Sequence, residues 1–131
     1  MSTKSHLLTG AWGEQVACHH LEGRGYSILA RNWRHGRDEL DIVARLPNEL
    51  VVVEVKTRST DLYGHPEEAV GPAKRRKLLR AALAYLEAHD LDLDLRFDVI
   101  SVTGTPRNAE VFHIEEAFVP IPEDDGETTA T

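Results

Sequence analysis

The sequence predicts an α/β fold, with a mixed central sheet flanked by helices. Two observations support this prediction. Helix-like and strand-like segments follow one another in the order α-β-β-β-α-β-β, and the strand-like segments are apolar and rich in β-branched residues. A chain of 131 residues with 41% hydrophobic residues can bury one sizeable core, but not two. We therefore expect a single domain over residues 1–119.

Each element has a local reason in the sequence. Residues 9–22 are expected to form the first helix, with Thr9 as its N-cap, after a short leader at residues 1–8. A second helix should begin at Pro72, because proline is well tolerated at the first helical position, and run to about residue 89. The strands are expected at residues 26–33, 39–46, 49–58, 95–103 and 110–118.

Two segments have a different composition. A loop rich in glycine, proline and acidic residues is expected at residues 59–71. The tail at residues 120–131 carries four acidic residues and no basic residue, so we expect it to be disordered.

The pair of strands at residues 39–46 and 49–58 brings two carboxylates together. A two-residue Pro-Asn turn joins the strands, and this turn places Asp41 directly opposite Glu54. Directly opposed side chains in an antiparallel pair have Cβ atoms about 4.5–5.5 Å apart. Because side chains alternate along a strand, Lys56 lies on the same face as Glu54.

Charged residues at these positions need an explanation. The strand at 49–58 is built on a run of valines, and an unpaired charge buried among them is costly. Two carboxylates this close repel unless a cation or a proton lies between them. A metal-dependent phosphodiesterase site would explain Asp41, Glu54 and Lys56 together. The alternative is an ordinary cross-strand salt-bridge face that also includes Glu39.

A third carboxylate points toward the same region. On a helical wheel, Glu14 falls between Ala17, Cys18 and Leu21, inside the apolar face of the first helix. A glutamate on a core-facing stripe is either hydrogen-bonded there or is a ligand of a metal or water. We therefore include Glu14 among the candidate site residues.

Several separated motifs follow one another between residues 9 and 102. They are Gly13-Glu14, Gly25-Tyr26, Arg31-Asn32-Trp33-Arg34, residues 39–45, residues 53–58, residues 63–70 and Lys74 with the basic residues after it. Together these motifs resemble the YraN family of small bacterial proteins. That family is similar to the archaeal Holliday-junction resolvases, within the restriction-endonuclease-like PD-(D/E)xK superfamily. The resemblance implies a restriction-endonuclease-like core of order α-β-β-β-α-β.

The resemblance also implies a role for each candidate residue. Asp41 and Glu54 correspond to the metal ligands, and Lys56 to the catalytic lysine. Glu14 corresponds to the helix glutamate of the resolvase-like branch. Oxygen ligands favour Mg²⁺ or Mn²⁺, and the carbonyl of Val55 could complete the ligand set.

The chain departs from the resembled pattern at two positions. Position 40 is Leu rather than the proline in the superfamily's name. Position 38 is Asp, where the family usually has glycine, which adds a charge beside the site. Neither departure removes a candidate catalytic group.

The net charge of −7 opposes a nucleic-acid partner, but the charge is unevenly distributed. The tail supplies four of the negative charges. Basic residues concentrate at the start of the second helix, where they oppose the helix dipole, an arrangement that a bound phosphate would explain. These residues are Lys74, Arg75, Arg76, Lys77 and Arg80, and Arg31, Arg34, Arg37 and Arg58 could extend the patch. Trp33 is either a stacking surface for bases or a core residue.

The sequence therefore predicts a Mg²⁺- or Mn²⁺-dependent endonuclease acting on branched DNA, such as a Holliday junction. Two symmetric cuts would favour a homodimer. The alternatives are a nucleic-acid-binding accessory protein with little or no cleavage activity and a structural module whose charged face is incidental. One cysteine and the absence of a signal peptide or long apolar run favour a cytoplasmic protein.

Overall fold

The computed structural model describes residues 2–58 and 70–119, and for residues 2–10 the backbone alone. The elements follow the expected order α-β-β-β-α-β-β. They are α1 (Ser2–Gly23), β1 (Ser27–His35), β2 (Asp38–Leu46), β3 (Glu49–Arg58), α2 (Pro72–Ala88), β4 (Asp94–Gly104) and β5 (Ala109–Phe118). The loop at residues 59–69 and the tail at residues 120–131 lie outside the described residues, so their predictions stay untested.

The boundaries agree with the sequence except at the first helix. α1 begins at Ser2, so Thr9 lies inside the helix and its prediction as an N-cap was wrong. The segment from residue 2 to residue 8 contains neither proline nor glycine, and nothing in it stops the helix from extending toward the N-terminus. β3 has the predicted bounds, and the other strands differ by no more than two residues at either end.

The five strands form one mixed sheet in the order β1-β2-β3-β4-β5. Neighbouring strands are antiparallel except β3 and β4, which are parallel and joined through α2. The Pro-Asn turn pairs Leu46 with Glu49, and the register continues to the pair Ile42 and Val53. The predicted register of the β2–β3 hairpin is therefore confirmed over these pairs, whereas the predicted pair Asp41 and Glu54 lies beyond the last pair of the ladder.

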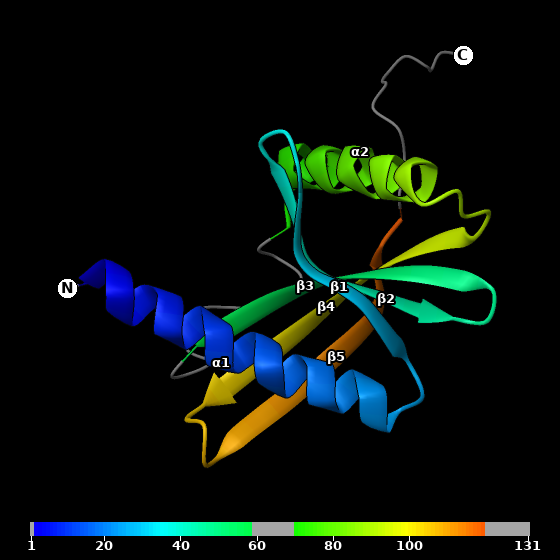
Figure 1. Cartoon of the computed structure of the whole chain (residues 1–131). Coiled ribbons are helices and arrows are strands. Elements are labelled where there is room, and N and C mark those ends of the chain that lie inside the picture. Colours follow the sequence, from blue (N-terminus) through cyan, green and yellow to red (C-terminus); the bar gives the residue numbers. More distant parts are fainter. Residues whose placement is uncertain (1, 59–69, 120–131) are drawn as a thin grey trace.

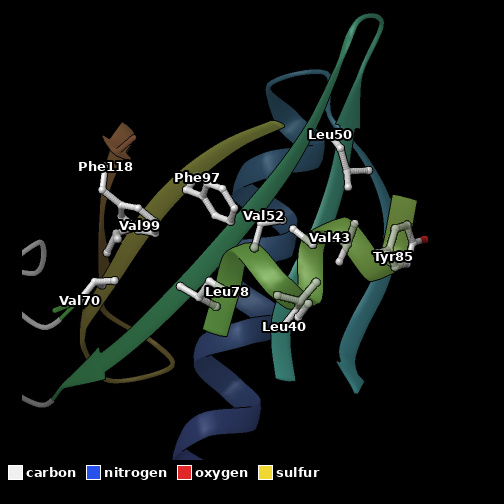
Figure 2. Close-up of a cluster of buried hydrophobic side chains, with 12 residues drawn as sticks. Leu40, Val43, Leu50, Val52, Val70, Leu78, Tyr85, Phe97, Val99 and Phe118 are labelled. Carbon is white, nitrogen blue, oxygen red and sulfur yellow. The ribbon is translucent and has the colours of Figure 1, made fainter. Parts of the chain in front are cut away.

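The two helices cover opposite faces of the sheet (Figure 1). α1 packs through Ala17, Cys18 and Leu21 against the face that includes Ile42 and Val53. α2 packs on the other face, and Figure 2 shows its side chains meeting those of β2, β3 and β4. The labelled members of this second core are Leu40, Val43, Leu50, Val52, Val70, Leu78, Tyr85, Phe97, Val99 and Phe118.

The first of these faces also holds a buried ionic cluster around Asp98 of β4. The Asp98 carboxylate accepts hydrogen bonds from Arg96 at 2.7 and 2.9 Å and from the Glu116 backbone N–H at 3.1 Å. His113 Nε2 lies 2.8 Å from the same carboxylate. Burial would raise the pKa of Asp98, but these hydrogen bonds hold it below its usual value. The cluster ties β5 to β4 without a role in the site described below.

Among the described residues, we find no helix whose length and apolar content would let it cross a bilayer.

Candidate metal and nucleic-acid site

The site is built where the β2–β3 ladder ends. The last pair of that ladder is Ile42 and Val53. One residue beyond it, the Asp41 carboxylate accepts a hydrogen bond from the backbone N–H of Val55 at 2.9 Å. β3 continues to pair with β4 up to Arg58, so its edge toward β2 opens beyond Val53. The Asp41 side chain lies in this opening, between the two strands.

The alternation of side chains in β2 reverses at Asp41. A strict period of two would put Leu40 and Ile42 on the same face. Instead, Leu40 belongs to the core under α2, and Ile42 belongs to the core under α1. On β1, Asn32 lies opposite Asp41, between the pairs Arg31–Ile42 and Trp33–Leu40. This irregularity turns the Asp41 carboxylate toward β3.

The backbone of Asn32 explains how β1 follows this reversal. Its φ of 53° is in the left-handed region, which asparagine tolerates better than most residues. Its side chain donates a hydrogen bond to Glu14 Oε1 at 3.0 Å. Asn32 thus connects the irregular part of the sheet to α1, a role that the sequence analysis missed. The signal available in the sequence was an asparagine near the end of a predicted strand, a residue that is uncommon in strands.

Glu54 lies on the α2 face of β3, with its side chain 5% exposed. Its Oε2 atom is 2.7 Å from Nζ of Lys74 in α2 and 3.5 Å from Nζ of Lys56 in β3. The predicted proximity of Lys56 to Glu54 is therefore confirmed. The sequence analysis assigned Lys74 to phosphate binding and did not foresee its contact with this carboxylate.

Glu14 reaches the same region from α1, with its side chain 15% exposed. Besides accepting the hydrogen bond from Asn32, it lies 3.7 Å from the guanidinium of Arg31. Its charge raises the pKa of Asp41. The charges of Glu14 and Glu54 therefore both act on Asp41, and Glu14 is held by side chains of β1.

The proton affinities in the site reflect this crowding. Burial and the charge of Glu54, helped by Glu14, raise the pKa of Asp41 to about 7, although the Val55 N–H opposes the shift. Burial alone would lower the pKa of Lys74, but its hydrogen bond to Glu54 and the nearby carboxylates raise it above its usual value. The carboxylates thus favour any cation placed between them.

The donor atoms fit a hard divalent cation. Asp41 and Glu54 supply carboxylate oxygens. The N–H and C=O of a strand residue point to the same side, so the Val55 carbonyl faces β2, where the ladder has ended. Across residues 2–58 and 70–119, no three histidine, cysteine, aspartate or glutamate side chains are grouped closely enough to hold a metal. Mg²⁺ needs only one or two carboxylates, because it keeps several waters.

An open groove of about 260 Å³ leads away from Asp41. It lies between the start of β2 and the first turns of α2. Its lining is charged, and its only apolar member among the described residues is Leu78. The other lining residues are Arg37, Asp38, Glu39, Asp41, Lys74 and Lys77. Gly71, the N-cap of α2, provides no side-chain hydrogen bond, and the first turn carries no acidic residue.

The predicted basic residues have different contacts in the structure. Lys74, Lys77 and Arg37 line the groove. Arg75 donates to the Val70 carbonyl at 2.8 Å, and its guanidinium lies over the ring of Phe118. The remaining predicted members have other positions. Arg31 contacts Glu14 and Gln15, Arg34 contacts Glu39 at 3.7 Å, Arg58 lies at the end of β3, and Arg76 is exposed on α2.

Two further predicted residues, Arg80 and Trp33, are involved in contacts between α2 and the sheet. Arg80 pairs with Asp38 through two hydrogen bonds of 2.8 and 3.2 Å, so it connects α2 to β2. This pairing also accounts for the unusual Asp at position 38, and the hydrogen bond from Arg80 lowers the pKa of Asp38. Trp33 packs edge-to-face on Tyr85 at 5.1 Å and against the α2 core, which is the core role considered for it.

The fold and the site together define a small α/β protein. Two carboxylates, Asp41 and Glu54, and two lysines, Lys56 and Lys74, lie where the β2–β3 ladder of its sheet ends. The family model described as "Uncharacterised protein family UPF0102" matches residues 13–102. The chain belongs to this family, also called YraN, which confirms the resemblance found in the sequence.

Individual relatives agree with this assignment. A UPF0102 protein of Bacteroides thetaiotaomicron is 50% identical over 115 residues, covering 88% of this chain and 95% of that protein. One from Syntrophotalea carbinolica is 50% identical over 117 residues, with the same coverage of each chain. One from Porphyromonas gingivalis is 49% identical over 117 residues, covering 86% of this chain and 85% of that protein.

Proposed function

We propose that this protein is a Mg²⁺- or Mn²⁺-dependent endonuclease that hydrolyses phosphodiester bonds in branched DNA, with a Holliday junction as the favoured substrate. The observation that carries the proposal is the placement of Asp41, Val55 and Glu54 at the open end of the β2–β3 ladder, with Lys56 beside them. Within this proposal, the sheet and its two helices are the core of a PD-(D/E)xK enzyme.

Each residue has a distinct task. Asp41 and Glu54 hold the cation, and the Val55 carbonyl supplies a neutral oxygen ligand. When bound, the cation acidifies a water and neutralises charge on the phosphate. The Lys56 ammonium, 3.5 Å from Glu54, orients the attacking water and offsets the added negative charge. Glu14, held by Asn32, would accept a hydrogen bond from a water of the bound cation.

The groove explains how a nucleic acid would reach this site despite the net charge of −7. Arg37, Lys74 and Lys77 line the groove together with Asp41. Cationic side chains and the backbone N–H groups at the start of α2, where Gly71 offers no side chain to cap them, both favour phosphate oxygens. The DNA backbone would therefore be held along the groove, with one phosphate next to the cation.

Branched DNA and a homodimer are the finer parts of this proposal. Resolution of a four-way junction requires two symmetric cuts, which a two-fold dimer would place on opposing strands. The support is the likeness of the site pattern to the resolvase-like branch of the superfamily.

A second candidate is an accessory protein that binds nucleic acid with the same fold and cleaves little or not at all. Asp38 and Glu39 favour it, because they place two negative charges in the same groove as the three cations. Such a groove suits weak, transient binding better than tight capture of a polyanion.

Turnover distinguishes the two candidates. Purified protein is incubated with labelled four-way junction, flap, linear duplex and single-stranded DNA, in Mn²⁺ or Mg²⁺, beside Asp41→Ala and Lys56→Ala. Cleavage that both substitutions abolish supports the endonuclease, and the preferred DNA defines its substrate. Binding without cleavage by the wild-type protein favours the accessory protein, and neither binding nor cleavage refutes both candidates.

A further inference from the structure

One oxygen of Glu54 is shared by two ammonium groups. Nζ of Lys74 lies 2.7 Å from Oε2, and Nζ of Lys56 lies 3.5 Å from the same atom. The shorter contact is made by the residue from α2, which is distant in sequence. The Lys74 charge also acts on Asp41, whose pKa it lowers. Lys74 is therefore the principal counter-ion of the carboxylate pair in this structure.

This contact competes with a divalent cation. A Mg²⁺ ion bound to Glu54 would lie about 2.0–2.1 Å from a carboxylate oxygen. An ammonium group kept at 2.7 Å from the same oxygen would then be within a few ångströms of a doubly charged ion. Two cations at such a distance repel each other, and burial of Glu54 strengthens the repulsion relative to bulk water. A divalent cation bound to Oε2 of Glu54 would therefore weaken the contact of Lys74 with the same atom.

Lys74 and Lys56 differ in how easily each side chain can move away from Glu54. The Lys74 side chain is 45% exposed and lines the groove, so its flexible stem can move toward open solvent. The Lys56 side chain is 23% exposed and originates two residues from Glu54 on the same strand. Displacement of Lys74 therefore meets less resistance from its surroundings than displacement of Lys56.

We propose that Lys74 is an exchangeable counter-ion, which a divalent cation displaces from Glu54 and which then binds a phosphate group in the groove. This inference rests on the metal site of the proposed function. In this exchange, metal binding and phosphate binding each increase the affinity for the other. A bound cation releases Lys74 from Glu54, and a bound phosphate keeps Lys74 away from Glu54. Without the cation, Lys74 keeps the carboxylates neutralised and is withheld from DNA.

The test is a calorimetric titration of the full chain with Mn²⁺ alone, in the absence of nucleic acid. Lys74→Met removes the competing ammonium, so it should bind Mn²⁺ about fivefold or more tightly than the wild type. Lys77→Met removes a cation of the same groove that has no contact with Glu54 among the described pairs, and its Mn²⁺ affinity should stay within about twofold of wild type. This control separates direct competition from a general loss of positive charge.

Thermal unfolding gives an independent readout. Without metal, Lys74→Met should lower the Tm because the carboxylate pair loses its counter-ion, and saturating Mn²⁺ should restore it to the value of the metal-loaded wild type. Lys74→Arg keeps the charge and serves if Lys74→Met does not fold. Its Mn²⁺ affinity should equal or fall below that of the wild type, because guanidinium binds carboxylate at least as well.

The outcomes separate the exchange from the metal site itself. If the wild type binds Mn²⁺ and Lys74→Met binds it equally or more weakly, the exchange is refuted but the metal site is not. An equal gain in Lys77→Met also overturns it. Failure of wild type and of all three variants to bind Mn²⁺ refutes the metal site, and the exchange with it.

Discussion

Gly13 of α1 lies directly against the side chain of Thr57 in β3, so closely that a Cβ atom at position 13 would overlap Thr57 Oγ1. The glycine is needed here for proximity, since its φ is ordinary for a helix. The contact determines how near α1 approaches the sheet, one residue before Glu14. A helix displaced from Thr57 would carry Glu14 away from Asn32 and Asp41.

Gly13→Ala should therefore destabilise the protein, although alanine favours helix more than glycine does. Overpacking typically costs about 1–3 kcal/mol, which the gain in helix propensity of about 1 kcal/mol only partly offsets. Urea unfolding measures the difference, and Thr57→Ala in the same chain should recover part of it. Gly23→Ala is the matched control, because a Cβ there would meet no atom within 4 Å. Equal stability of Gly13→Ala and the wild type would contradict this account.

Asp98 should contribute to the stability of the fold, although it is not part of the candidate site. Its buried carboxylate balances the guanidinium of Arg96, whose side chain is 11% exposed. Asp98→Asn leaves that guanidinium without its buried anion, and breaking a buried pair in this way costs about 3–5 kcal/mol. Glu49→Gln removes only the more exposed partner of Arg96, 3.2 Å away, and should cost less than about 1 kcal/mol. Denaturant midpoints of the two variants test this ranking, and similar losses in both would refute it.

DNA binding should depend on the cations of the groove rather than on the whole predicted patch. Arg37→Ala with Lys77→Ala should weaken binding and reduce the slope of log affinity against log salt by about two. Arg24→Ala is the control, because Arg24 precedes β1 at the end of the β1–β2 pair opposite to Arg37. Fluorescence anisotropy with a labelled four-way junction in Ca²⁺ measures all three proteins. An equal effect of Arg24→Ala would indicate general charge attraction instead of a groove.

The sequence predicted the parts of the site that depend on local pattern. A two-residue turn and a period of two were enough to obtain the β2–β3 register, and hence the proximity of Asp41 to β3. The same period fails at Asp41 itself, because the left-handed backbone of Asn32 and the break in β2 reverse the alternation. A pattern rule assumes regular strands, and it cannot foresee an irregularity formed jointly by two of them.

Long-range pairings were the other part that the sequence left open. A cluster of basic residues at the start of a helix shows that positive charge is present, but not which carboxylate each residue meets. Lys74 meets Glu54, Arg80 meets Asp38 and Arg75 meets a backbone carbonyl. These differences depend on the position of α2 over the sheet, which packing of its apolar side fixes. The different contacts of these basic residues are therefore set by the tertiary structure and cannot be read from their order in the sequence.

The raised pKa of Asp41 predicts a characteristic pH dependence of the metal-free protein. The pKa is about 7 in the folded chain, against an ordinary value of 3.8, so the folded state binds the proton more tightly. The stability that Asp41 contributes is fully present below about pH 3.8 and is lost as the pH rises through 7. Asp41→Asn removes this loss, so in EDTA its Tm should exceed that of the wild type at pH 8, and the difference should shrink toward pH 5.

With Mn²⁺ in place of EDTA, the Tm of the wild type should exceed that of Asp41→Asn at pH 8. The reason is that Mn²⁺ binds the deprotonated Asp41 carboxylate and therefore stabilises only the wild type. Its affinity for the wild type should rise as the pH approaches 7 and level off above, with release of up to one proton on binding at pH 6. Titrations in buffers of different ionisation enthalpy measure that proton. Glu39→Gln is the matched control, since Glu39 lies in the same groove but outside the ligand set, and it should keep the wild-type pH dependence. A wild-type Tm that does not vary with pH in EDTA, or Mn²⁺ binding without proton release, would show that Asp41 is already ionised in the folded protein.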